Sequence, residues 1–161
     1  MNTTIKVVDN FLPKDIFKNL KDTFLSNNFP YFYNSGKVNK SDSDFQFTHI
    51  LFENNKINSN YFDLLLPVIN KLDCKSIIRI KTNLTTKTEI IKPFIFHNDF
   101  DFKCTTSIFY INSNNGKTLF KDGNEVNSIE NRMVIFPSTI KHTGPTHTDE
   151  KIRVVINFNY F

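Results

Sequence analysis

The second half of the chain is a succession of short segments rich in β-branched and aromatic residues, and no other feature limits the fold as much. Turn-forming residues separate the segments, for example Asn-Asn-Gly at 114–116 and Asp-Gly-Asn at 122–124. Segments of this length and composition are typical of strands. The expected strands are 76–84, 90–96, 105–111, 118–120, 132–136 and 153–161. Six or more short strands predict a small β-sandwich or jelly roll.

The first half of the chain has a different pattern, with apolar residues at three- and four-residue spacings. After Pro13 these residues are Ile16, Phe17, Leu20, Phe24 and Leu25, which would share one face of a helix. Pro13 suits the first turn of that helix because its missing N–H would have no partner there. A second helix is expected over residues 60–72, and further strands over 5–8, 31–33 and 46–52.

Together the two halves predict a mainly β chain of the α+β class. The expected fold is a double-stranded β-helix (jelly roll) with the two helices of the N-terminal half packed on one sheet. At 161 residues the chain has the length of one domain, 1–161, in which residues 1–73 would support a core formed by 74–161. The two cysteines, Cys74 and Cys104, are too far apart for a metal knuckle and are expected to be reduced, buried thiols.

Targeting and charge patterns exclude several classes of protein. The N-terminal residues lack the basic start and continuous apolar stretch of a secretory signal, and no apolar run approaches a membrane span. We therefore expect a soluble, cytoplasmic protein without a membrane partner. The net charge of +4 permits an acidic partner, but the lysines are spread along the chain, which argues against a nucleic-acid-binding patch.

Three residues form a candidate metal site. If the strand over 90–96 continues, His97 and Asp99 point to the same face, roughly 6–7 Å apart along the chain. His142 follows another expected strand and a turn at Pro137, so a neighbouring strand could bring it opposite this pair. Two imidazoles and one carboxylate on one face would leave three positions of an octahedral Fe(II) open.

Arg153 opens the last expected strand and is a candidate anion ligand. Along that strand Arg153, Val155, Asn157 and Asn159 share one face, which is more polar than the other. A guanidinium buried on the inner face would be costly unless it met an anion. A dicarboxylate would supply that anion, because the planar fork of arginine matches a carboxylate in two hydrogen bonds.

The order H-x-D, distal His, then Arg about ten residues later resembles the signature of the Fe(II)/2-oxoglutarate dioxygenases. The similarity is greatest to the prolyl-4-hydroxylase-like branch, including small members encoded by bacteriophages. Residues 107–112, 116–120 and 8–12 also look like segments of that branch. The resemblance implies that Tyr110 binds the distal carboxylate of 2-oxoglutarate beside Arg153. Asn157, on the same strand face as Arg153, is a third candidate cosubstrate ligand.

The resemblance implies a reaction as well as a fold. Fe(II), 2-oxoglutarate and O2 would be required, with ascorbate as a further candidate, and a substrate C–H bond would be hydroxylated with release of succinate and CO2. A protein or peptide substrate is favoured over a small molecule or a nucleic acid. Substrate-recognising loops are expected at 31–44 and 81–91. The host would be a bacterial or phage-infected cell.

Competing interpretations exist for the residues and for the function. Asp101 falls on the same face as Asp99, and His147 competes with His142; the spacing in the family and the polar loop around His147 favour Asp99 and His142. His49 is expected to be structural. For Arg79, entry into the substrate pocket is one alternative, and an ion-paired or solvated surface residue is the favoured one. Arg132 is expected at the start of a strand, as a hairpin residue. The rival functions are a cupin-like metal-binding isomerase or hydrolase, which has no need for Arg153, and a non-catalytic jelly-roll binding module.

Overall fold

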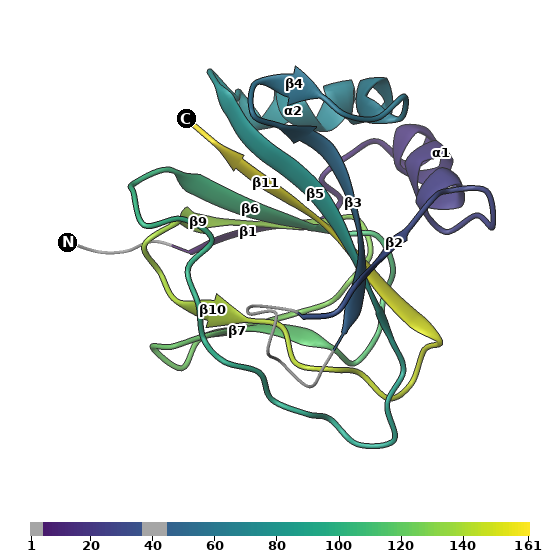
Figure 1. Ribbon diagram of the computed structural model, residues 1–161, viewed down its shortest axis with the longest axis vertical. Helices are drawn as coiled ribbons and strands as arrows, with labels where there is room; N and C mark the ends of the chain where they lie inside the picture. Colours follow the sequence, from purple (N-terminus) through teal and green to yellow (C-terminus); the bar gives the residue numbers. More distant parts are fainter. Residues whose placement is uncertain (1–4, 37–44) are drawn as a thin grey trace.

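Two antiparallel sheets make up most of the computed structural model, which describes residues 5–36 and 45–161 (Figure 1). The larger sheet has the strand order β1-β9-β6-β11-β5-β3-β2, with β4 paired to β3, and the smaller has the order β10-β7-β8. The strands of the larger sheet are β1 (Lys6–Val8), β2 (Phe32–Asn34), β3 (Gln46–Glu53), β4 (Lys56–Ile57), β5 (Ile77–Thr86), β6 (Thr105–Tyr110), β9 (Arg132–Pro137) and β11 (Ile152–Tyr160). The smaller sheet consists of β7 (Lys117–Phe120), β8 (Glu125–Asn127) and β10 (His142–Thr143).

The helices cover one side of the larger sheet, and the smaller sheet lies on its other side (Figure 1). Helix α1 (Lys14–Phe24) starts after Pro13, as predicted, and buries Phe17, Leu20 and Phe24. The predicted second helix is a 3₁₀ turn, η1 (Phe62–Leu65), continued by α2 (Leu66–Leu72). In the described part of the chain, no helix has the length and apolar character needed to cross a membrane.

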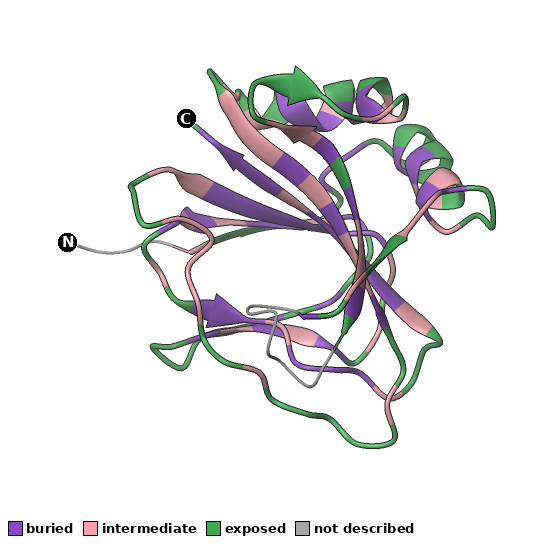
Figure 2. Cartoon of the chain, in the orientation of Figure 1, coloured by how far each residue is buried: buried purple, intermediate pink, exposed green. Residues whose placement is uncertain are grey.

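Successive side chains of the central strands point to opposite faces of the larger sheet, and each face contributes to a separate apolar cluster. On β11, Val154, Ile156 and Phe158 face the helices and belong to the main apolar core. A second apolar cluster, which includes Ile108 of β6 and Phe120 of β7, lies between the sheets. Buried residues therefore occupy both faces of the central strands, as Figure 2 shows for β6 and β11.

One predicted strand is wrong, although those at β1, β2, β3, β5, β6, β7, β9 and β11 are confirmed to within three residues at either end. Residues 90–96 form an extended loop without strand pairing, and Ile90 and Ile95 are exposed. The loop is held instead by hydrogen bonds to Thr146, such as Lys92 N–H to Thr146 Oγ1 at 2.8 Å. Pro93 has no N–H and cannot donate to a ladder.

Other details depart from the expectations. The short strands β4, β8 and β10 were not predicted, and β5 runs to Thr86 through part of an expected recognition loop. Residues 37–44 of the other expected loop lie outside the described residues. Cys74 and Cys104 are free thiols, as predicted, but they are only partly buried.

Candidate metal and cosubstrate site

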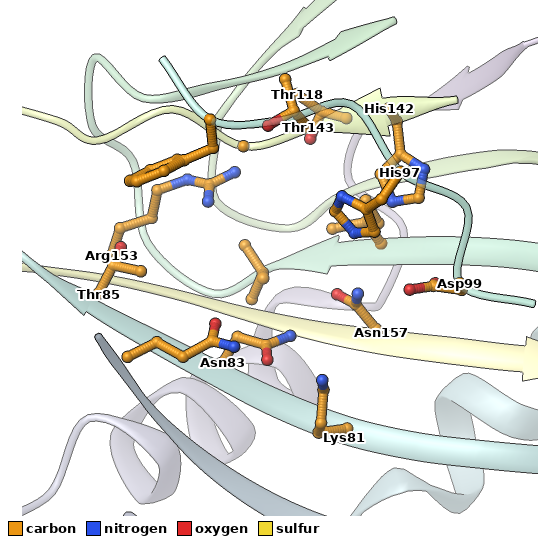
Figure 3. A pocket seen from close by; sticks show the side chains of 15 residues that line it. Lys81, Asn83, Thr85, His97, Asp99, Thr118, His142, Thr143, Arg153 and Asn157 are labelled. Carbon is orange, nitrogen blue, oxygen red and sulfur yellow. The ribbon is translucent and has the colours of Figure 1, made fainter. Parts of the chain in front are cut away.

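A polar cavity lies between the two sheets, on the side of the larger sheet that faces away from the helices (Figure 3). The central strands β3, β5, β6 and β11 form one wall, and β7, β10 and the loop before β6 form the other. The lining residues are Gln46, Lys81, Asn83, Thr85, Phe94, His97, Asp99, Ile108, Thr118, His142, Thr143, Gly144, Arg153, Val155 and Asn157. Most of these side chains are polar, which is unusual for the space between two packed sheets.

Several buried polar atoms of the cavity lining have no hydrogen-bond partner within the described parts of the chain. They are Asn83 Oδ1, Thr85 Oγ1, Thr143 Oγ1 and Asn157 Oδ1. Buried polar atoms are nearly always bonded in folded proteins, so a group of unbonded ones around a single cavity indicates a polar ligand. This observation supports a polar ligand rather than an apolar one.

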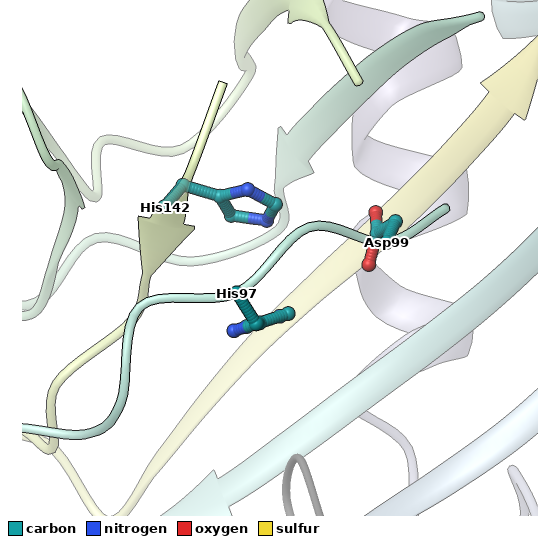
Figure 4. A group of neighbouring side chains, drawn as sticks. All are labelled: His97, Asp99 and His142. Carbon is teal, nitrogen blue, oxygen red and sulfur yellow. The ribbon is translucent and has the colours of Figure 1, made fainter. Parts of the chain in front are cut away.

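His97, Asp99 and His142 lie together at one end of the cavity (Figure 4). One ligand atom from each residue lies within 4.8 Å of the others. His97 and His142 form an isolated antiparallel bridge, in which the N–H of each donates to the carbonyl of the other at 3.0 Å. Because both backbones are tied at the ligand positions, the two imidazoles are held side by side, with ring centroids 4.9 Å apart.

In each of the two imidazoles, one nitrogen faces a backbone carbonyl and the other does not. Nδ1 of His97 lies 3.3 Å from Ile95 O, and Nδ1 of His142 lies 3.4 Å from Ile140 O, which leaves both Nε2 atoms for a metal. The ring of Phe136 packs edge-on against His142 at 4.9 Å. Burial lowers the pKa of His142 below its usual value. A neutral imidazole is the form that binds a metal.

Both oxygens of Asp99 are held by other side chains. Arg79 Nη2 lies 3.2 Å from Oδ1, and Asn159 Nδ2 donates to Oδ2 at 3.0 Å. Burial on its own would raise the pKa of Asp99, but the charges of His142 and Arg79 and the Asn159 hydrogen bond together hold it below its usual value. The carboxylate is therefore ionised and fixed in direction before any metal binds. Arg79 also lies over the ring of Phe100, 4.9 Å from its centroid.

Arg153 lies at the other end of the cavity and is held by neutral partners. Its Nε donates to Ser128 Oγ at 2.8 Å and its Nη2 to Lys117 O at 3.3 Å. Within the described ranges, no carboxylate is within ion-pair distance of the guanidinium, and burial lowers its pKa. Gly116 makes room for the side chain, because a Cβ there would lie 2.8 Å from Arg153 Cδ. A buried cation without an anion is costly, so this pocket favours an anionic ligand.

Tyr110 and Asn157 lie near Arg153 and near the metal candidates, respectively. The fully buried Tyr110 bonds through its hydroxyl to Thr118 Oγ1 at 2.6 Å, and the guanidinium of Arg153 lies 5.8 Å from its ring centroid. Asn157 lines the cavity between Arg153 and Asp99 (Figure 3). The alternation predicted for the last strand is confirmed, since Arg153, Val155 and Asn157 line the cavity and Asn159 contacts Asp99.

Similar folds occur among solved structures. A prolyl hydroxylase from Trichoplax adhaerens, in complex with a hypoxia inducible factor peptide fragment, superimposes with a TM-score of 0.72 at 13% identity, covering 99% of this chain and 84% of that one. The viral collagen prolyl hydroxylase of Paramecium Bursaria Chlorella virus-1 gives 0.61 at 12%, covering 98% and 96%. The α-ketoglutarate-dependent epimerase SnoN of nogalamycin biosynthesis gives 0.71 at 11%, covering 99% and 78%.

The chain has the fold of the 2-oxoglutarate-dependent oxygenases. At these identities the likeness is one of fold. No family model matches the sequence, and no curated protein matches it either. The neighbours include a hydroxylase and an epimerase, so the oxygenase fold by itself does not determine the reaction.

The competing residues are not part of the candidate metal cluster. Asp101 is exposed, and neither it nor the buried His147 belongs to the group formed by His97, Asp99 and His142. Nδ1 of His49 lies 2.6 Å from Pro30 O, and its ring packs among aromatic rings, in agreement with a structural role. Arg132 begins β9 and forms a two-point ion pair with Asp9, at 2.6 and 3.0 Å.

Part of the cavity wall lies within the expected recognition loop 81–91, but on a strand, and its individual residues were not predicted. Lys81, Asn83 and Thr85 alternate along β5 and line the cavity in this oxygenase fold. The period of two in residues 80–85 indicates that residues 81, 83 and 85 share one face. It does not indicate which strand pairs with β5, and so it does not place that face in the cavity. Arg79 was expected to be ion-paired or solvated at the surface; it is ion-paired, but with Asp99 and with its side chain only 16% exposed.

Proposed function

We propose that the protein is a non-haem Fe(II)- and 2-oxoglutarate-dependent dioxygenase. The observation that carries the proposal is the buried Arg153, which has no acidic partner in the described structure and shares a cavity with His97, Asp99 and His142. A metal site alone is compatible with many reactions, whereas a metal site facing a buried guanidinium suits a dicarboxylate that spans the two.

The donor set fits Fe(II). His97 and His142 would each contribute Nε2 and Asp99 a carboxylate oxygen, which leaves open positions on one side for the cosubstrate and O2. Bound Fe(II), with 2-oxoglutarate and O2, would supply the oxidising chemistry that hydroxylates a C–H bond, with release of succinate and CO2. The protein would orient the ligands and hold the ionised carboxylate of Asp99 in position.

The cosubstrate would lie between the metal and Arg153. The guanidinium would bind the distal carboxylate, while Thr118, bonded to Tyr110, would place a hydroxyl next to it. Asn157 would face the middle of the cosubstrate. The finer description of the fold, a double-stranded β-helix in a single domain over 1–161, and a cytoplasmic location belong to the same proposal.

A peptide or protein substrate is favoured for this proposed oxygenase. The Trichoplax enzyme of the same fold is seen with a peptide fragment, which supports this class of substrate. SnoN, with a comparable TM-score, belongs to nogalamycin biosynthesis, so a small-molecule substrate is the second candidate.

The proposal is tested first by anaerobic addition of Fe(II) and 2-oxoglutarate. We expect a visible metal-to-cosubstrate charge-transfer band, followed on admission of O2 by release of succinate. His97→Ala and Asp99→Ala should lose both signals, because each removes a metal ligand. Arg153→Met should raise the Kd for 2-oxoglutarate by at least tenfold while metal binding persists.

The rival functions give different results in the same experiment. A cupin-like isomerase or hydrolase would bind the metal but show no affinity for 2-oxoglutarate, and its behaviour would not depend on Arg153. A non-catalytic binding module would show no Fe(II) affinity at all. Full succinate release by the Asp99→Ala variant would contradict the assignment of the metal ligands.

A further inference from the structure

Lys81 occupies the centre of the cavity wall and has no role in the function proposed above. It lies on β5, directly opposite Asn157 of β11 in the strand register. Figure 3 shows its side chain rising from the strand, with the amine directed toward Asn157. The amine therefore enters the cavity from the floor, between the end that holds Arg153 and the end that holds Asp99.

The amine of Lys81 has no direct acidic partner among the described residues. None of the ion pairs within the described ranges involves it. Asp99 is the acidic residue of the cavity wall, and its two oxygens are already engaged by Arg79 and Asn159. Burial, together with the charge of Arg79, lowers the pKa of Lys81, although the charges of Asp99 and Glu53 act in the opposite direction. The Lys81 amine therefore has no ion pair with Asp99.

Bound Fe(II) and 2-oxoglutarate would not neutralise the cavity either. Among the described residues, the charges of Arg79, Arg153 and Lys81 and the two of Fe(II) would face one negative charge each from Asp99 and Glu53 and two from 2-oxoglutarate. The filled cavity would keep a surplus of positive charge. A surplus of one sign in a low-dielectric cleft selects ligands of the opposite sign.

The neighbours of Lys81 can assist in binding an anion. Asn83 and Asn157 flank it across the wall, and each has a buried Oδ1 without a hydrogen-bond partner in the described structure. A carboxamide can rotate by half a turn to present its two N–H donors instead of its oxygen. One cation and two adaptable amides then surround the same space.

We propose that Lys81 and Asn83, with Asn157 on the boundary to the cosubstrate, form a subsite for an anionic group of the primary substrate, a carboxylate or a phosphate, next to the proposed metal site. This inference rests on the proposed function, because it assigns 2-oxoglutarate to Arg153 and the substrate to the remaining space. The substrate would carry its negative group close to the C–H bond that is oxidised, as an acidic side chain or a phosphate ester would.

The subsite can be tested with inorganic phosphate and with acetate as probes. The protein is loaded with 2-oxoglutarate and with Mn(II), a paramagnetic ion that takes the place of Fe(II), and nuclear relaxation of each probe is measured by phosphorus or carbon NMR. We expect enhanced relaxation of at least one probe in the wild type. Enhancement of phosphate alone points to a phosphate ester, of acetate alone to a carboxylate, and of both to the shared anion chemistry.

Three variants make the test specific. Lys81→Met should reduce the enhancement at least tenfold, whereas Lys81→Arg should keep most of it because the charge remains. Lys121→Met, which removes the same charge from an exposed residue of the turn between β7 and β8, should behave as the wild type does. The Kd for 2-oxoglutarate, measured by titration in all four proteins, should change by less than twofold.

Other results would overturn the inference in distinguishable ways. No enhancement with either probe in the wild type, or equal enhancement in Lys81→Met, would exclude an anion subsite at this lysine. A tenfold loss of 2-oxoglutarate affinity in Lys81→Met would make the residue a cosubstrate anchor instead. If the wild type itself binds no 2-oxoglutarate, the proposed function fails, and the subsite inference falls with it.

Discussion

Asp99 is held at both oxygens by side chains from two neighbouring strands. Arg79 of β5 and Asn159 of β11 face each other in the register, and Arg79 Nη2 also donates to Asn159 Oδ1 at 3.2 Å. Asn159 in turn donates to Thr106 on β6 at 3.1 Å. This chain of contacts links the direction of the carboxylate to three adjacent strands, so Arg79 would act as a positioning residue for the proposed metal site.

Replacing Arg79 should therefore weaken metal binding without removing a ligand. We expect Arg79→Met to raise the Kd for Fe(II) or Mn(II) by about 10- to 100-fold, the usual effect of losing a partner of a metal ligand. Arg79→Lys should recover part of the affinity through its charge. Metal titrations of the three proteins measure this, and an unchanged Kd in Arg79→Met would show that Asp99 is held by other contacts.

Gly116 is the residue on which the position of Arg153 depends. A Cβ there would lie 2.8 Å from Arg153 Cδ and 2.7 Å from Asn114 Oδ1. Gly116→Ala should displace the guanidinium, cost about 1–3 kcal/mol of stability through overpacking, and raise the Kd for 2-oxoglutarate by about tenfold, equivalent to about 1.4 kcal/mol. Thermal melting and cosubstrate titration measure the two effects.

Gly123→Ala is the matched control. Gly123 lies in a turn at φ 92°, where alanine is strained, but a Cβ there meets nothing within 4 Å. This variant should lose stability and keep the wild-type affinity for 2-oxoglutarate. An equal loss of affinity in both variants would mean that general destabilisation, rather than contact with Arg153, is responsible.

At the scale of elements, the attachment of α1 to the sheet depends on aromatic packing. Phe109 of β6 is fully buried and makes edge contacts with Phe11 and Phe17, at centroid distances of 5.7 and 5.9 Å. Phe109→Ala should lower the free energy of unfolding by about 3–5 kcal/mol. The exposed Phe32 offers a control, since Phe32→Ala should change it by about 0.5 kcal/mol or less. Urea denaturation distinguishes the two, and equal effects would contradict the assigned core.

Local pattern was sufficient to predict most elements, and where it failed the cause is physical. The spacing of Phe17, Leu20 and Phe24 records burial of one helix face, so α1 could be predicted from the sequence. The apolar residues at 90–96 suggested a strand, but no neighbouring strand is available to pair with them, and Ile90 and Ile95 remain exposed. Pairing is a non-local property that apolar composition does not record.

At the scale of the whole molecule, the buried histidine and carboxylate make the metal-free protein sensitive to acid. The folded-state pKa of His142 is lowered, so the unfolded chain takes up a proton more readily, and stability is lost as pH falls below the unfolded value of about 6.5. The pKa of Asp99 is also lowered, so its contribution is present above the unfolded value of about 3.9 and is lost as pH falls through the folded pKa.

We expect the metal-free protein to have a lower free energy of unfolding at pH 5 than at pH 7.5. His142→Asn removes the histidine titration, so the decrease should be smaller in this variant. Urea denaturation in the presence of a chelator, at both pH values, measures the difference. An equal decrease in the two proteins would show that His142 is not the source.

The site could be predicted from the sequence only in part, for a reason that concerns the whole chain. His97, Asp99, His142 and Arg153 were recognisable because their order and spacing resemble a known signature. The contact of Arg79 with Asp99 and the place of Lys81 in the cavity depend on how β5 is registered against β11. The alternation along β5 assigns both side chains to one face of the sheet, but it does not record which residues of distant segments lie opposite that face.

The alternation along β5 assigns core packing and the cavity lining to different residues of the same strand. Ile80 and Thr82 are fully buried on the helix side, while Lys81, Asn83 and Thr85 face the cavity, and none of these five residues is a candidate metal ligand. Positions 81, 83 and 85 can therefore vary between descendants of this chain with little penalty to folding or to the metal centre. We expect selection for new substrates to act on this strand first, and a library restricted to these three positions is the shortest route to altered specificity.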